Sequence, residues 1–234
     1  ALFFYYLAAL GFSDLYSLIG VLFFYTARPV IQFTGIPLAD ASAYFFMLLC
    51  LFALLRENFL LLFLGFSVGV FAKETLLFII PVILLSAFDY KTKTKEVFWL
   101  APITIAYFIF RFYIAPDPEE AQFILPLALV IKNQLFYLSH LNSVNHMLDL
   151  FSAFGLLWIP AFYTLFFLKP YFLLRRWSWL ILIILIVGGG YSGRLVFLSF
   201  PIVIPLAIYW ISRVLSPSMK EPAGETRAPN SLTF

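Results

Sequence analysis

The sequence predicts an all-α fold, a polytopic transmembrane helical bundle of about eight spanning or half-spanning segments. One further helical segment is expected along the outer membrane interface. Of the 234 residues, 63% are hydrophobic and 12% are charged, and the mean hydropathy is +0.98, as in an integral membrane protein. Short polar turns separate the apolar segments. One apolar run, 59–88, carries two adjacent opposite charges, Lys73 and Glu74, at its middle.

The run 59–88 predicts a helical hairpin that stops short of the far membrane surface. As one straight helix it would be about 45 Å long, well beyond the ~30 Å hydrocarbon core. Arg56 precedes the run, and three lysines, Lys91, Lys93 and Lys95, follow it. If both basic flanks are cytoplasmic, the chain goes out and returns, with Lys73 and Glu74 at the outer turn. Each arm is then about 21 Å long, so this turn lies just inside the outer interface.

The other apolar segments alternate in direction around this hairpin. Asp40 follows a short turn and is placed to cap the helix after it. The expected spans are 1–11 inward, 15–33 outward with a kink at Pro29, 41–55 inward, 97–114 outward, 151–168 inward, 177–187 outward and 194–213 inward. Trp99, Trp177 and Trp179 are expected near membrane boundaries.

Two segments are not expected to span. Residues 115–150 mix apolar and polar side chains and predict one or two helices along the outer interface. Residues 214–234 are polar and contain proline, which predicts a disordered cytoplasmic tail after a membrane domain over 1–213. Residue 1 is Ala within an apolar stretch, so we expect the chain to be cut from a longer protein.

The basic residues support this orientation. The expected topology places ten inside and five outside or in the outer leaflet, in agreement with the positive-inside rule. The inner ten are Arg56, Lys91, Lys93, Lys95, Lys169, Arg175, Arg176, Arg213, Lys220 and Arg227, and the outer five are Arg28, Lys73, Arg111, Lys132 and Arg194.

Five charged residues converge in depth under this topology: Arg28, Asp40, Lys73, Glu74 and Arg194. Lysine and arginine stabilise a phosphate through charge-assisted hydrogen bonds. A carboxylate can accept the proton of an attacking hydroxyl group. The five residues therefore predict a phosphate site with a proton acceptor. The glycine-rich stretch GGGYSGR, 188–194, would let backbone amides approach the anion.

Plainer interpretations of these residues stay open. Lys73 and Glu74 could be a neutralised pair that ends two helices, and Asp40 could serve only as a helix cap. Arg28 could extend towards lipid headgroups, and Arg194 could contact ordinary phospholipid.

The two histidines, His140 and His146, are six residues apart with no nearby cysteine, which is a poor zinc pattern. No metal site is predicted from them. They are surface residues, or they contact a sugar if this segment covers the cavity. Asp117, Glu119 and Glu120 could bind a divalent cation near the phosphate, although no cofactor is required by their spacing.

Three stretches resemble GT-C-type membrane glycosyltransferases. The stretch GFSVGVFAKET, 65–75, with Pro81 after it, is similar to the Gly-x-x-x-Gly-x-x-x-Lys hairpin of that family. GIPLAD, 35–40, resembles its second outer turn, and GRLVFLSFP, 193–201, its last core helix. The most similar patterns are those of the dolichyl-phosphate-mannose mannosyltransferases and the aminoarabinose transferase of lipid A.

The resemblance implies an enzyme of the cytoplasmic membrane whose active site faces outward. It would move a sugar, with inversion, from a polyprenyl- or dolichyl-phosphate donor to a glycan, lipid or protein acceptor. Lys73 and Arg194, with Arg28, would bind the donor phosphate, and Asp40 and Glu74 would orient the lysine, the sugar or the acceptor. The carboxylate pair of the family's first outer loop, which carries its catalytic base, has no counterpart here except Glu119-Glu120, in a different loop. The chain is therefore expected to begin after that loop, to lack the principal base and not to be active alone. Membrane lipids are expected partners, and nucleic acid is not.

Other functions stay open. A transporter or flippase would use the buried charges as a substrate pathway, and inverted repeats would be usual for it. A structural membrane subunit would pair Lys73 with Glu74 and leave no cavity beside them. An O-antigen ligase or polymerase would also use polyprenyl-linked donors, with a larger and more arginine-rich outer loop than 115–150.

Overall fold

The computed structural model describes most of the chain, and the secondary structure of the residues described is helical, without a β-strand. The described residues are 1–33, 40–85, 90–114, 143–168, 174, 177–181, 184 and 196–215. The helices are α1 (Leu2–Ala9), α2 (Asp14–Thr26), α3 (Arg28–Phe33), α4 (Asp40–Leu55), α5 (Phe59–Ala72), α6 (Ile79–Leu85), α7 (Tyr90–Ile109), α9 (Val144–Phe154), α10 (Trp158–Phe167) and α14 (Phe200–Leu215). Short 3₁₀ segments are η1 (Glu74–Phe78), η4 (Gly155–Leu157) and η6 (Phe197–Ser199), and η2 (Phe110–Ile114) is a π-helical turn.

Two helical stretches are long and apolar enough to cross a membrane by length and composition, Met147–Phe167 and Phe197–Leu215. Five shorter apolar helices accompany them in the described part of the chain. Large apolar side chains also lie exposed in stripes, such as Leu60, Leu64 and Val68 along α5. Exposed apolar stripes of this kind are unusual on soluble monomers. These features favour a membrane protein, and the larger number of spans stays a prediction.

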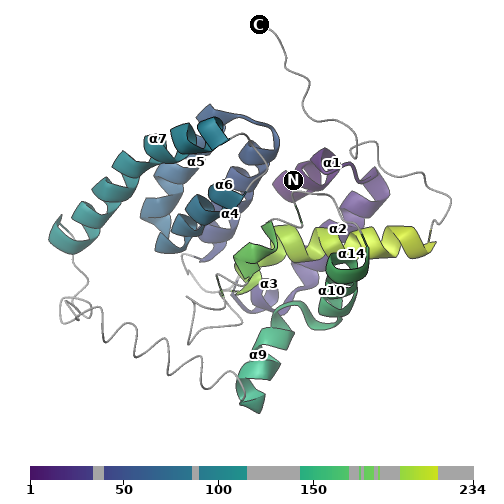
Figure 1. Ribbon diagram of the computed structural model, residues 1–234. Coiled ribbons are helices and arrows are strands. Elements are labelled where there is room, and N and C mark those ends of the chain that lie inside the picture. The colour runs from purple at the N-terminus through teal and green to yellow at the C-terminus, as the bar shows by residue number, and fades with distance from the viewer. Residues whose placement is uncertain are drawn as a thin grey trace, which may run out of the picture.

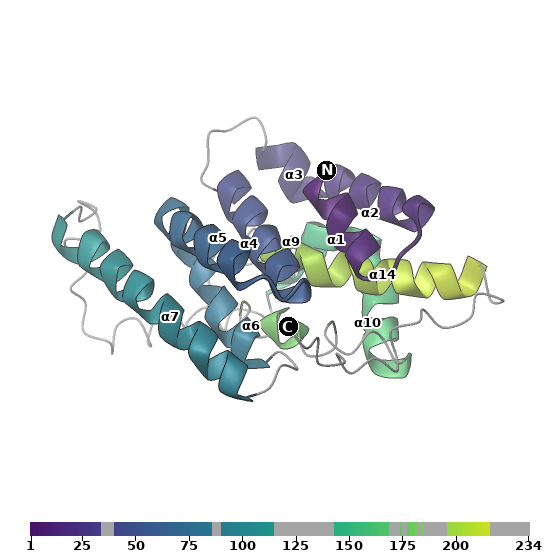
Figure 2. The same cartoon turned by 90° about the horizontal axis from the view of Figure 1, so that it is seen from above.

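The helices form two neighbouring groups (Figure 1). One group contains α4, α5, α6 and α7, and the other contains α1, α2, α10 and α14. In the second group α14 lies between α2 and α10 (Figure 2) and contacts both. The ten residues 200–209 of α14 are all buried, so this helix forms the centre of that group.

Helix α14 contains Pro205, and a tyrosine from α1 compensates for it. A proline has no backbone N–H, so the carbonyl four residues earlier, that of Pro201, loses its helical donor. The buried Tyr6 hydroxyl donates a hydrogen bond to this carbonyl at 2.8 Å. Thr164 of α10 likewise donates to the Leu206 carbonyl at 2.9 Å. The first bond satisfies a buried carbonyl where water cannot reach it, and the second joins α10 to α14.

Glycines of α5 allow it to pack closely against α4. A Cβ atom added at Gly69 would lie 2.6 Å from Phe46 Cβ, and one at Gly65 would lie 3.2 Å from Leu49 Cδ2 and 3.4 Å from Cys50 Sγ. Phe46 therefore faces Gly69, and Cys50 faces Gly65, which makes the two helices antiparallel. Glycines four residues apart are a common means of close helix contact in membranes.

The structure confirms the helix break expected at Lys73. Helix α5 is capped at its start by Asn58, whose side chain accepts from the Leu61 N–H at 3.0 Å. It ends at Ala72, and Lys73 is extended, with φ −160° and ψ 126°. Segment η1 then begins at Glu74 and leads into α6, which contacts α4 and α7.

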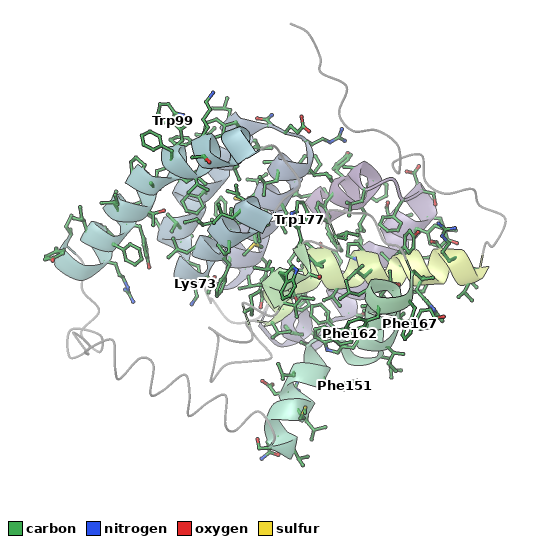
Figure 3. The ribbon with its side chains drawn as sticks, viewed as in Figure 1. Lys73, Trp99, Phe151, Phe162, Phe167 and Trp177 are labelled. Atoms are coloured by element: carbon green, nitrogen blue, oxygen red, sulfur yellow. The ribbon has the colours of Figure 1, made fainter. Side chains whose placement is uncertain are left out.

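One local expectation is corrected. The kink expected at Pro29 is instead a break at Ala27, with φ −64° and ψ 135°. Pro29 then falls in the first turn of α3, where a missing N–H costs no helical hydrogen bond. Of the three tryptophans expected near membrane boundaries, Trp177 is fully buried within the protein, while Trp99 and Trp179 are exposed. Figure 3 shows Trp177 between the two groups of helices, where a large apolar ring fills the space.

Candidate functional site

Six aromatic rings from different elements meet where several helices begin or end. This aromatic junction consists of Phe3, Phe24, Tyr44, Phe154, Phe197 and Phe200. Ring centroids are 4.7 Å apart between Phe24 and Phe200, 5.1 Å between Tyr44 and Phe197, and 5.3 Å between Phe154 and Phe197. The junction therefore joins α1, the end of α2, the start of α4, the end of α9 and the start of α14.

The junction lies at helix ends that neighbour the predicted site residues in the sequence. Arg28 comes four residues after Phe24, and Asp40 comes four residues before Tyr44. Asp40 is the first residue of α4 and Arg28 the first of α3. The structure thus brings the end of α2 near the start of α4, and the joint role of Arg28 and Asp40 stays a prediction.

Lys73 lies near this same end of α4, the N-terminal end. Because α4 and α5 run antiparallel, with Phe46 beside Gly69, the C-terminus of α5 lies near the N-terminus of α4. Figure 3 shows Lys73 at one end of this helix group and Trp99 at the other. The Lys73 side chain is half-buried, and the backbone N–H of Lys73 donates a hydrogen bond to the Gly69 carbonyl at 2.9 Å. The lysine is therefore held at the point where α5 stops.

An apolar pocket of about 430 Å³ lies against the junction. Residues of α1, α2, α3, α4 and α14 line it: Ala1, Leu2, Phe3, Val21, Phe24, Tyr25, Pro29, Val30, Ala41, Tyr44, Phe45, Leu48 and Phe200. Arg28 is exposed and directly precedes Pro29 and Val30. Sequence reasoning missed this pocket, because its walls come from segments far apart in the chain and carry no motif.

The remaining predicted residues are described only in part or not at all. Arg194, His140, Asp117, Glu119, Glu120 and the GGGYSGR stretch lie outside the described residues. The same holds for the side chains of Asp40, Glu74 and His146, whose backbones begin α4, begin η1 and lie in the first turn of α9. The expected pairing of Lys73 with Arg194 stays a prediction. Helix α9 contacts α3, so the helix that carries His146 meets the one that begins with Arg28.

The two cations at these helix ends indicate which kind of ligand the candidate site can bind. Arg28 and Lys73 are cations at helix ends, and Arg28 directly precedes two residues that line the apolar pocket. Charge-assisted contacts to an anion are strongest where water is scarce. Within the described part of the chain, no three His, Cys, Asp or Glu residues gather as a metal site.

Comparison with protein-family models finds no match, and comparisons with characterised proteins and with solved structures find no significant match.

Proposed function

We propose that this protein is a multi-pass membrane glycosyltransferase. It transfers a sugar from a polyprenyl-phosphate donor to a glycan, lipid or protein acceptor, with inversion. The active site faces outward from the cytoplasmic membrane. The observation that carries the proposal is the helix break at Lys73, at the end of the α4–α5 pair where Asp40 begins α4.

The reaction needs an anion site, a base and a shared position for two substrates. The acceptor hydroxyl oxygen attacks the anomeric carbon, a new C–O bond forms, and the bond from that carbon to the phosphate oxygen breaks. The leaving phosphate keeps the electron pair, and Lys73, Arg194 and Arg28 offset its charge. Asp40 or Glu74 takes the hydroxyl proton, and His140 and His146 contact the sugar. Holding both lipid-bound substrates at one interface supplies proximity.

The test of this proposal is the variant Lys73→Ala in a membrane transfer assay with a radiolabelled lipid-linked sugar. The lysine acts on charge that develops on the leaving group, so we expect the transfer rate to fall about a hundredfold or more. Lys95→Ala is the matched control, because Lys95 is an exposed lysine of α7 at the far end of the helix group.

Membrane levels and thermal unfolding of both variants are measured first, so that a loss of transfer can be separated from misfolding. Equal transfer by Lys73→Ala and the parent protein, at equal membrane levels, would reject the role of Lys73, and a parent protein that transfers no sugar would reject the proposed function.

A further inference from the structure

We propose that helix α9 (Val144–Phe154) lies along the membrane surface with one side in lipid, and that the chain turns into the bilayer only at Gly155. The partner of this exposed helix is therefore the lipid surface itself. This placement goes beyond the proposed function and does not depend on the transfer reaction.

The outward side of α9 is divided lengthwise into an apolar strip and a polar strip. The apolar strip consists of four side chains that are 44% to 72% exposed: Val144, Met147, Leu148 and Phe151. The polar strip contains Asn145 and Asp149, which are also exposed. Residues three and four positions apart share one side of a helix, so the two strips run parallel along α9.

The two strips together exclude two simpler environments for α9. In water, a row of four exposed apolar side chains would be an unusual surface. Within the hydrocarbon, the carboxylate of Asp149 and the amide of Asn145 would both be costly, because nothing there replaces their water. A helix with lipid along one side and water along the other avoids both costs, as amphipathic helices do at a membrane interface.

The exposed apolar side chains continue from α9 into α10. After the bend, Leu156, Ile159 and Phe166 are again among the exposed large apolar residues. They belong to the candidate span Met147–Phe167, which is mostly unburied within the protein. Lipid that covers α10 therefore reaches the apolar strip as well. The sequence of α9 contains no lysine or arginine, so this contact depends on apolar area and not on anionic headgroups.

The bend after α9 is held by specific contacts. Gly155 has φ +54°, the left-handed conformation that often ends a helix. The Trp158 Nε1–H donates a hydrogen bond to the Leu150 carbonyl at 3.1 Å. In an unbroken helix these two residues would be about 12 Å apart along the axis, so the hydrogen bond requires the chain to turn between them. The sequence pattern begins the inward span at residue 151, and the bend moves this boundary to Gly155.

The end of α9 is joined to the candidate site. Ala153 and Phe154 are buried, and Phe154 stacks on Phe197 in the aromatic junction. Helix α9 also contacts α3, which begins with Arg28. The rest of α9 projects from the body of the protein (Figure 1), and Figure 3 shows Phe151 on this projecting helix. An interfacial α9 therefore sets the candidate site at the depth of the lipid headgroups.

The test measures the depth of nitroxide labels on the full chain in phosphatidylcholine vesicles. Cys50→Ala removes the single native thiol, so that each variant carries one label. Labels on Val144→Cys, Leu148→Cys and Phe151→Cys should lie at one depth, about 5–10 Å into the boundary between headgroups and acyl chains. A straight transmembrane helix would instead place residues 144 and 151 about 10 Å apart in depth.

Asn145→Cys is the matched control, since Asn145 is exposed on the polar strip of the same helix. Its label should be relaxed by a water-soluble nickel complex, whereas labels on the apolar strip should be relaxed by oxygen dissolved in lipid. Adding phosphatidylglycerol should leave every depth unchanged. Leu148→Glu should shift the label at Phe151 towards water, and Asn145→Glu should not. Thermal unfolding shows that each variant is folded, and the labelled positions are all exposed.

Three results would overturn the placement. A depth that increases steadily from residue 144 to residue 151 would make 147–167 a single span. Equal access of the nickel complex to labels at Leu148 and Asn145 would put the apolar strip in water. Spin–spin broadening between labels on different copies would make the strip a protein contact. Sugar transfer is not measured in these experiments, so their outcome is separate from that of Lys73→Ala.

Discussion

The two candidate membrane spans have similar lengths and opposite surroundings. Met147–Phe167 has 21 residues and Phe197–Leu215 has 19, and both are strongly apolar, yet the buried share of the apolar window is 22% in the first and 67% in the second. The second span contains α14, which lies between α2 and α10 (Figure 2). The comparison shows that apolar composition predicts a span, while the neighbours of the helix decide whether it meets protein or lipid.

Small residues and ring contacts explain the difference. On the α14 side, Gly20 of α2 lets Ile208 approach, since a Cβ at Gly20 would lie 2.6 Å from Ile208 Cδ1. On the α10 side, a row of rings runs along the helix, and the stacked rings of Trp158 and Phe162 have centroids 5.1 Å apart. Phe166 and Phe167, at the end of α10, are exposed, as expected for side chains that contact lipid tails.

The largest effect should come from truncating a ring in the buried span. Phe200 is 1% exposed and contacts four rings of the junction, so Phe200→Ala should lower the free energy of unfolding by about 3–5 kcal/mol. Phe166 is 73% exposed, and Phe166→Ala should change it by less than about 0.5 kcal/mol. Unfolding by SDS in mixed micelles measures both. Similar losses would mean that the two spans do not differ in burial.

A smaller effect should follow from Tyr6→Phe, which removes the donor to the Pro201 carbonyl. That carbonyl has no helical partner, so the loss should be about 1–3 kcal/mol. The double variant Tyr6→Phe with Pro205→Ala restores a backbone donor, and it should recover part of the lost stability. Failure of the double variant to recover any would contradict the proposed role of Tyr6.

The bend in the exposed span should be less costly to disturb. Gly155 has φ +54°, and no atom lies within 4 Å of an added Cβ. Gly155→Ala should therefore cost about 1–2 kcal/mol through backbone strain alone. Gly155→Asn tolerates this conformation better and should cost less in the same unfolding measurement. Equal stability of Gly155→Ala and the parent would show that the bend between α9 and α10 is not fixed at this residue.

The smallest effect should arise where the two spans meet. Thr164 donates to the Leu206 carbonyl across the α10–α14 contact, and this carbonyl also has the usual helical donor. Thr164→Val should cost about 0.6 kcal/mol, the typical value for hydrogen bonds between membrane helices. A loss as large as that of Tyr6→Phe would place more of the stability of α14 in its contact with α10 than the burial pattern indicates.

Local chemistry made some features predictable and long-range packing hid others. Charges in an apolar run predicted the break at Lys73, and the turn before Asp40 predicted the start of α4, because both depend on nearby residues. The hydrogen bond from Tyr6 to Pro201 joins residues 195 positions apart, which no local pattern encodes.

The candidate site divides in the same way. The residues beside it were named from charge and from a resemblance. The structure brings the end of α2 and the end of α5 near the start of α4. The pocket was not foreseen, because Phe3, Tyr44 and Phe200 form it only after α1, α4 and α14 have packed. Its shape depends on tertiary structure, whereas a charge can be recognised from the sequence.

Cys50 gives this protein an internal reporter of helix separation. It is the single cysteine of the chain, and it is fully buried where α4 faces Gly65 of α5. An alkylating reagent can reach its thiol only when these two helices part. The rate at which the unmodified protein reacts therefore measures how often the α4–α5 pair opens, without any probe being introduced.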